Sequence, residues 1–248
     1  MAEFKQQSRL LAIDSPLGDD VLLLTRLEGE EHVSTLFSFD IELYSKRKHI
    51  GPEEIVGQNV TLKLMEVDDD TFMQNSYRHI NGYVRSFRGE GQELQGLRCY
   101  RAEIVPWFWF LTQTSDSKIF QNKTVKEIAT QIFSENGFTD YQFKVAGQHP
   151  SREYCVQYQE SDFNFLSRLF EEEGIYYYFT HEAGKHTLII SDHIGGYSVC
   201  DEASVNYQQG SMSPHTVHAW RHNYQFRTGR YAQRDYDFKK PSHRLQTG

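Results

Sequence analysis

The sequence predicts a mainly β protein with an α+β insert. Apolar and polar residues alternate in several short runs of the first hundred residues, which is the period of half-buried strands. Helical periodicity is confined to the middle of the chain. The composition includes 17 Phe and 15 Tyr but only 6 Pro, which favours an ordered, aromatic-rich β core over disorder. A chain of 248 residues can form one large domain or two smaller ones.

Residues 1–115 are predicted to form a small antiparallel β-barrel or sandwich. The clearest strand is the one in which Phe37, Phe39, Ile41 and Leu43 alternate with polar residues. A Pro at the start and a Gly at the end of 52–57 predict one helical turn. Strands are expected at 10–14, 21–27, 37–43, 60–66, 77–87 and 97–105, with a hairpin tip at 68–70 and a connection at 89–96.

The middle segment, residues 116–202, is predicted to hold two helices. Thr124 and Glu127 have the spacing of a capping box, and apolar residues then recur at helical spacing as far as Phe133. The second helix is expected at about 161–173, ended by Gly174. A hairpin follows, with strands at 175–179 and 187–190 and a turn at 182–185. The apolar run 106–111 predicts a short helical plug at the end of the barrel.

Residues 203–248 are predicted to begin a second β-barrel. Two long strands are expected at 217–226 and 230–238, joined at 228–229. The tail after Lys240 shows no terminating element. Because one hairpin cannot build an independent barrel, we expect the chain to be part of something longer.

Composition argues against several classes of partner. The net charge of -8 and the lack of any basic cluster beyond 46–48 argue against nucleic-acid binding. The apolar runs are too short to span a bilayer, and the N-terminus lacks the apolar region of a secretory signal.

The three cysteines are Cys99, Cys155 and Cys200. Their irregular spacing is that of reduced, packed thiols and predicts neither disulfides nor a metal knuckle.

No motif in the sequence carries catalytic chemistry. His181 and His186 nearly match a zinc-protease motif, but a spacing of five does not place two side chains on one helix face. We therefore expect two surface histidines that flank a turn. The acidic run 171–173 opposes the macrodipole at a helix C-terminus, so it has either a specific basic partner or full solvation. The sequence predicts no enzyme, and no catalytic, cofactor-binding or metal-binding residue.

The segment 152–179, Arg-Glu-Tyr-Cys-Val-Gln-Tyr-Gln-Glu-Ser-Asp-Phe-Asn-Phe-Leu-Ser-Arg-Leu-Phe-Glu-Glu-Glu-Gly-Ile-Tyr-Tyr-Tyr-Phe, resembles the signature of VgrG proteins. Blocks at 105–111, 119–124 and 234–241 also resemble that family in the same order, as do the short stretches 15–18 and 36–39. The signature residues, to which the resemblance assigns structural roles, are Tyr154, Val156, Tyr158, Glu160, Ser161, Asp162, Phe163, Phe165, Leu166, Gly174, Tyr176, Tyr177 and Phe179.

The resemblance implies a structural part in a type VI secretion spike. VgrG proteins form a homotrimeric hub of two similar β-barrels per chain, with an α/β segment between the barrels. The hub sits on the Hcp tube, and an OB-fold and a needle follow, which carry a PAAR-type tip protein and effectors. Assembly in the bacterial cytoplasm and export without a signal peptide are also implied. The OB-fold and needle do not occur in these 248 residues. We therefore expect that a protein of these 248 residues does not form the trimer unaided.

Two alternatives remain open at the level of sequence. A phage or prophage tail hub protein would have the same fold, and genomic neighbours would separate it from a secretion spike. An aromatic-rich β module that binds carbohydrate is a remote second alternative. Exposed Trp and Tyr side chains on a concave face would favour that module.

Overall fold

The computed structural model describes residues 4–6, 9–67, 74–198, 206–207, 216–217, 219–226, 229–230, 232–236 and 238–247. The chain forms two compact units, residues 1–197 and 198–248. The first unit contains a barrel-like sheet and a helical segment. The predicted boundary between 202 and 203 lies outside the described residues.

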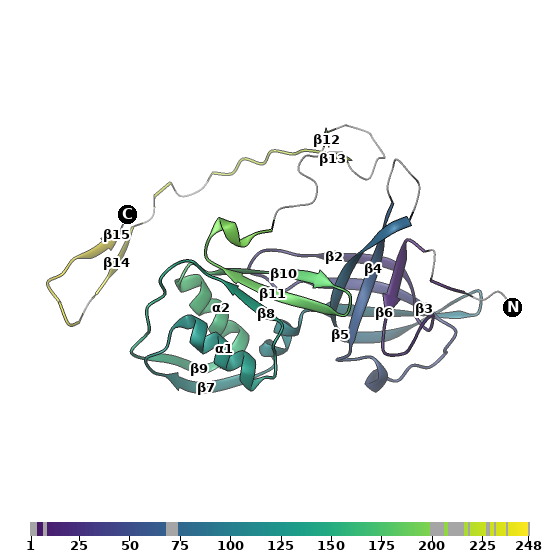
Figure 1. Ribbon diagram of the computed structural model, residues 1–248, viewed down its shortest axis with the longest axis horizontal. Coiled ribbons are helices and arrows are strands. Elements are labelled where there is room, and N and C mark those ends of the chain that lie inside the picture. The colour runs from purple at the N-terminus through teal and green to yellow at the C-terminus, as the bar shows by residue number, and fades with distance from the viewer. Residues whose placement is uncertain are drawn as a thin grey trace. The chain divides into compact units, whose positions relative to one another are not determined.

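The first six strands form one curled antiparallel sheet (Figure 1). Its strands are β1 (Leu11–Asp14), β2 (Leu23–Glu30), β3 (Ser38–Ser45), β4 (Asn59–Val67), β5 (Gln74–Leu94) and β6 (Leu97–Val105), and their order in the sheet is β1-β4-β5-β6-β3-β2. The two edge strands, β1 and β2, contact each other, so the sheet curls into an antiparallel barrel-like domain. A single 3-10 turn, η1 (Pro52–Glu54), begins at the proline, where the sequence predicts a helical turn.

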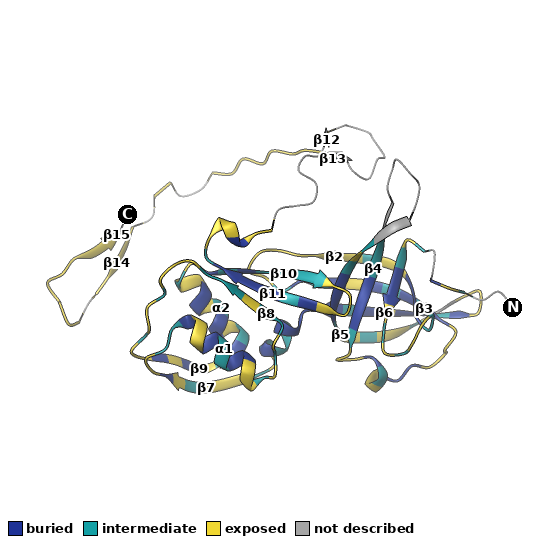
Figure 2. Ribbon diagram, in the orientation of Figure 1, coloured by how far each residue is buried: buried dark blue, intermediate teal, exposed yellow. Residues whose placement is uncertain are grey.

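The alternation in the sequence fixes which face of this sheet is buried (Figure 2). On β3, Phe39, Ile41 and Leu43 are buried and form part of one apolar cluster inside the curled sheet. Burial of each such side chain contributes about 1.5–3 kcal/mol relative to leaving it exposed. The outward positions of the same strand carry Asp40 and Glu42, so a shift of one residue in register would invert the two faces.

The β5–β6 hairpin differs from its predicted form. Residues 89–96 were expected to form the connection, but β5 continues to Leu94, and only Gln95 and Gly96 form the turn. Both residues have positive φ, 52° and 79°, as in the two-residue turns that match the twist of a hairpin. The tip predicted at 68–70 lies outside the described residues.

The helical segment places two helices between two small sheets (Figure 1). One sheet pairs β7 (Ser115–Phe120) with β9 (Cys155–Ser161), and the other has the order β10-β11-β8. The other elements of the helical segment are α1 (Val125–Glu135), β8 (Tyr141–Lys144), α2 (Asp162–Glu172), β10 (Tyr176–Glu182), β11 (Lys185–Ser191) and the 3-10 turn η3 (Ile194–Gly196). No helix in the described part of the chain is long and apolar enough to cross a membrane.

The capping signals predicted in the sequence are confirmed. The Thr124 hydroxyl accepts a hydrogen bond from the Glu127 backbone N–H at 3.2 Å, and the Glu127 carboxylate accepts one from the Thr124 N–H at 2.8 Å. At the start of α2, the Ser161 hydroxyl accepts from the Asn164 N–H at 3.2 Å. These contacts satisfy backbone donors that a helix N-terminus leaves unpaired.

The aromatic run after Pro106 forms a short helix as predicted, the 3-10 helix η2 (Trp107–Thr112), which directly follows β6. Trp107 and Phe108 belong to the core of the helical segment. The Trp107 ring stacks on Phe138 at 4.6 Å between centroids, and Phe108 meets Phe133 edge-on at 5.9 Å.

The second unit departs from its predicted strands. In place of two long strands at 217–226 and 230–238, the structure has the short pairs β12 (Asn206–Tyr207) with β13 (Thr216–Val217), and β14 (Gln233–Asp235) with β15 (Leu245–Thr247). β15 lies in the tail that was expected to have no element. The described residues 219–226, where the apolar and polar residues alternate, are assigned to no strand.

Candidate interaction surfaces and the joint between barrel and helical segment

The tip of the β10–β11 hairpin rests against the barrel sheet, and this contact is the joint between the barrel and the helical segment. The Gly184 N–H at the tip donates to the Thr61 hydroxyl on β4 at 3.0 Å. The fully buried Asn81 on β5 lies at the centre of the joint. Its side-chain amide nitrogen is 2.8 Å from Asn59 Oδ1, 3.0 Å from the Val60 carbonyl and 2.9 Å from the Thr61 hydroxyl.

His186 connects Asn81 to the aromatic turn η2. Its Nε2 accepts from the Trp107 backbone N–H at 2.9 Å, so Nδ1 carries the proton and donates to Asn81 Oδ1 at 2.8 Å. Burial, with a smaller effect from neighbouring His181, lowers the pKa of His186 to about 3. The side chain is therefore neutral near pH 7 and has the tautomer that both contacts require.

His181 lies beside His186 in the joint, and the expectation of two surface histidines was wrong. His181 Nδ1 accepts from the Asn81 backbone N–H at 3.2 Å, and Nε2 lies 2.8 Å from a Glu31 carboxylate oxygen. Antiparallel pairing places the two histidines opposite each other across the hairpin. No group of three His, Cys, Asp or Glu side chains suited to a metal occurs among the residues that the structure describes.

A second polar cluster closes the other end of the helical segment. His149 lies between Glu173, which follows α2, and Asp192, which follows β11, with a ring nitrogen 3.0 Å from each carboxylate. A neutral imidazole can donate only one hydrogen bond, so these two contacts favour the imidazolium. The Glu173 hydrogen bond, opposed by burial and assisted by Asp192, raises the pKa of His149.

The acidic run at 171–173 is partly paired. Arg152 donates to Glu172 at 2.6 Å and to Glu173 at 2.7 Å, and Arg168 lies 3.4 Å from Glu172. Basic partners therefore hold two of the three acids, in agreement with one of the two readings of the sequence. Glu171 has no ion pair in the part of the chain that the structure describes.

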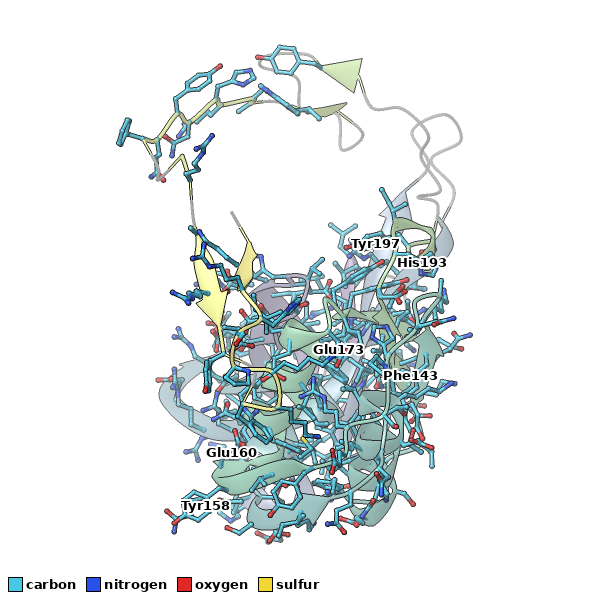
Figure 3. The ribbon with its side chains drawn as sticks, turned by 90° about the vertical axis from the view of Figure 1, so that its left-hand side faces the viewer. Phe143, Tyr158, Glu160, Glu173, His193 and Tyr197 are labelled. Atoms are coloured by element: carbon cyan, nitrogen blue, oxygen red, sulfur yellow. The ribbon has the colours of Figure 1, made fainter. Side chains whose placement is uncertain are left out.

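A tyrosine stack fixes the end of the first unit. The Tyr197 ring lies between Tyr176 and Tyr178, at 4.9 Å and 5.4 Å between centroids. The Tyr176 and Tyr178 hydroxyls donate to the carbonyls of His193 and Gly196. Figure 3 shows Tyr197 and His193 close together, at the end of the helical segment opposite Tyr158.

The outer face of the β7–β9 sheet exposes apolar side chains. Tyr154, Val156 and Tyr158 alternate along this stretch and are 57%, 37% and 70% exposed, and Ile119, opposite Val156, is 59% exposed. The intervening Cys155 and Gln157 are buried toward the helices. Three signature residues thus have much of their side chains on the outer face of this sheet.

The remaining signature residues lie at the start of α2, along it, or on β10. The buried Asp162 accepts from the Thr114 hydroxyl at 2.8 Å and from the Gln157 amide at 2.7 Å. Gly174 follows α2 with φ 67°, a conformation that a β-carbon disfavours. The other members are Glu160, which pairs with Arg168, the N-cap Ser161, the helix residues Phe163, Phe165 and Leu166, and Tyr176, Tyr177 and Phe179 on β10.

The cysteines within the described residues are buried and unpaired. Cys99 lies on β6 and Cys155 on β9, 2% and 6% exposed. Burial raises the pKa of both thiols, which makes them poorer nucleophiles near pH 7. Cys200 lies outside the described residues.

Comparison with known proteins gives a consistent family. The model of the phage tail baseplate hub (GPD) family matches residues 30–248. Two type VI secretion system spike proteins of Pseudomonas aeruginosa, VgrG1b and VgrG1a, are each 38% identical over 97% of this chain. The actin cross-linking toxin VgrG1 of Vibrio cholerae is 33% identical over 93% of it. The chain spans 32%, 37% and 22% of these three relatives.

Solved structures agree on the fold. The E. coli c3393 protein, a type VI secretion component described as similar to the T4 bacteriophage tail proteins gp27 and gp5, matches with a TM-score of 0.65 at 24% identity. That match covers 92% of this chain and 56% of the other. A prophage MuSo2 tail protein from Shewanella oneidensis matches with a TM-score of 0.50 at 16% identity, over 79% of this chain and 58% of that one. The resemblance to VgrG proteins is therefore confirmed, and the chain belongs to the phage tail baseplate hub (GPD) family.

Proposed function

We propose that this chain forms part of the hub of a type VI secretion spike and acts as a structural component. The observation that carries this proposal is the extent of the likeness: 38% identity to spike proteins over 97% of the chain, spread through both compact units. The joint supports a structural role, because its buried polar groups are engaged with one another and its buried histidine, His186, is neutral. Such a network holds a shape and leaves no acid or base free for substrate.

The proposed assembly is a homotrimer that joins an Hcp tube to a needle. Two barrels from each of three chains would present six similar modules to a hexameric tube. The curled sheet of β1 to β6 would be one of these modules, and residues 203–248 would contribute strands to the second. The alternation of Trp220, Tyr224 and Phe226 supports the second part of this proposal, because these side chains are largely exposed and need a sheet to cover them.

Further parts of the proposal concern partners and location. A PAAR-type tip protein and effectors would associate through regions beyond the hub. The protein would be assembled in the bacterial cytoplasm and exported by the secretion system without a signal peptide. The chain itself would have no enzymatic activity, and the structural roles of the signature residues at 154–179 belong to the same proposal.

A secretion assay tests this function directly. We expect deletion of the gene, in a strain with an active type VI system, to abolish release of Hcp into the medium, and the intact gene to restore it. Complementation with an Asn164→Leu gene serves as a control, because Asn164 is exposed on α2. Unchanged Hcp release from the deletion strain, in the absence of a second copy of the gene, would contradict the proposal.

A phage or prophage tail hub is the second candidate. The matching family model and the likeness to a Shewanella prophage tail protein favour it. This function predicts that the deletion strain, after prophage induction, releases particles without functional tails while Hcp release is unaffected. The two assays in one strain therefore separate the candidates.

A further inference from the structure

Residues 145–151, which follow β8, belong to no helix or strand and are fastened to their surroundings by side chains. The carboxylate of Asp192 accepts from two backbone N–H groups near the start of this loop, at 2.9 Å and 2.6 Å. Farther along, the His149 ring lies between Asp192 and Glu173, with a ring nitrogen 3.0 Å from each carboxylate. The loop is therefore tied to the ends of both β11 and α2.

The cluster around the His149 ring is largely buried and holds several charges. The side chains of His149, Glu173 and Asp192 are 13%, 16% and 8% exposed. Arg152, which precedes β9, donates to Glu173 at 2.7 Å, and Nδ1 of His193 lies 3.0 Å from an Asp192 oxygen. Each carboxylate thus has a partner besides His149, and carboxylates with such partners stay ionised near neutral pH.

Two further charged side chains lie at the margin of the cluster and are engaged elsewhere. Glu172 at the end of α2 accepts from Arg152 at 2.6 Å, and Nζ of Lys144 at the end of β8 lies 3.5 Å from the Gly196 carbonyl oxygen. The two carboxylates in direct contact with the ring are therefore the main influence on its charge.

Protonation of the His149 ring decides whether both of its contacts are attractive. The imidazolium donates from each nitrogen, one hydrogen bond to each carboxylate. The neutral ring carries a single N–H, so its second nitrogen directs a lone pair at a carboxylate oxygen 3.0 Å away. The hydrogen bond to Glu173, opposed by burial, raises the pKa of His149 above its ordinary value of about 6.5. The ring therefore loses its proton only above that pH.

We propose that His149 is a proton-operated latch for the loop at 145–151. With the ring protonated, the loop is fastened to the ends of both α2 and β11. When the proton leaves, one of the two contacts becomes repulsive, and the ring turns out into solvent. The later part of the loop then loses its tie to Glu173, and this carboxylate becomes accessible at the end of the helical segment.

The first part of the loop stays in place in both states. The backbone N–H groups of Ala146 and Gly147 still bind the Asp192 carboxylate, whose charge does not change. Opening is therefore confined to residues 148–151, and the apolar core between the helices is unaffected.

NMR spectroscopy of the full chain from about pH 5 to pH 9 tests the latch. The ring signals of His149 should titrate with a midpoint above about 6.5. The backbone amides of Gln148 and Ser151 should shift with the same midpoint. Their heteronuclear NOE should fall as the ring loses its proton, because opening frees this part of the loop on the fast timescale that the NOE reports. Amides of α1 should show no such change.

Three variants sharpen the test. Glu173→Gln removes one of the two carboxylates and should lower the midpoint of His149 by about one pH unit or more. Glu53→Gln, at an exposed acid of the barrel, is the matched control and should leave that midpoint unchanged. In His149→Gln the NOE of Ser151 should not vary with pH, which separates the latch from other titrating groups. Urea unfolding curves check that each variant is folded.

Several outcomes would overturn the proposal. They are a wild-type midpoint at or below about 6.5, an unchanged midpoint in Glu173→Gln, a loop NOE that does not follow the titration of the ring, and pH-dependent loop motion in His149→Gln. The proposed hub function would stand in each case, since the Hcp release assay does not measure the loop.

Discussion

Replacing Asn81 with Leu tests whether hydrogen bonds hold the joint. Leucine has nearly the same volume but neither donates nor accepts a hydrogen bond. The substitution leaves the Nδ1–H of His186 without an acceptor, in a position that is 2% exposed. It also removes the contacts to Asn59, the Val60 carbonyl and the Thr61 hydroxyl.

The expected loss of unfolding free energy follows from these contacts. One buried group left unpaired costs about 1–3 kcal/mol, and each other lost bond about 0.5–1.5 kcal/mol net. Asn59 is half-buried and can bind water in place of Asn81. The Thr61 hydroxyl keeps the Gly184 N–H as a partner. We therefore expect Asn81→Leu to destabilise the first unit by about 2–5 kcal/mol.

Urea denaturation followed by tryptophan fluorescence measures this loss. The control is Asn164→Leu at an exposed position, whose free energy of unfolding should lie within about 0.5 kcal/mol of wild type. A double-mutant cycle with His186→Phe isolates the Asn81–His186 bond. The double variant should be more stable than the sum of the single losses predicts, by about 1–3 kcal/mol, because the His186 donor that Asn81→Leu leaves unpaired is no longer present. An Asn81→Leu protein as stable as wild type would refute the reasoning and show that apolar contacts alone hold the joint.

Three further predictions concern the helical segment. His149→Gln should be less stable than wild type in acid, and the difference in stability should shrink as pH rises. Because folding raises the pKa of His149, its stabilisation is complete below the unfolded-state pKa of about 6.5 and is lost as pH rises through the folded-state pKa. Urea midpoints of both proteins measured across pH would show this. Phe133 and Leu169 are fully buried, so Phe133→Ala and Leu169→Ala should each lower the free energy of unfolding by about 2–5 kcal/mol. Lys126 is exposed, so Lys126→Ala should lower it by under about 0.5 kcal/mol. A larger loss for Lys126→Ala than for the other two in the same denaturation assay would refute the helix register. Tyr197→Ala should speed amide hydrogen exchange at residues 193–197 and leave α1 unchanged, and equal exchange in both proteins would show that the tyrosine stack does not order this segment.

Local signals explain the parts of the fold that the sequence predicted. Two such signals are the capping box of Thr124 and Glu127 and the alternation along β3. Both depend only on residues that lie within a few positions of each other, so they are visible in the sequence alone. The burial of His186 could not be predicted in this way. Its partners Trp107 and Asn81 lie 79 and 105 residues away in the chain, and a histidine beside a turn is ordinarily exposed.

The second unit shows a different limit of sequence patterns. Alternation predicted a strand at 217–226, and this prediction was wrong for the described residues 219–226, which belong to no strand. The His222 ring nevertheless neighbours both Trp220 and Tyr224, at 6.0 and 6.2 Å. A pattern of side chains cannot supply the backbone neighbour that turns an extended segment into a strand.

The joint at Asn81 has a mechanical consequence. Hydrogen bonds weaken steeply when their angles change. The contacts of Asn81, His181 and His186 therefore resist rotation of the hairpin on the barrel as well as separation from it. In a spike that is driven along one axis, thrust applied to the barrel would reach the helical segment as translation, with the angle between the two preserved.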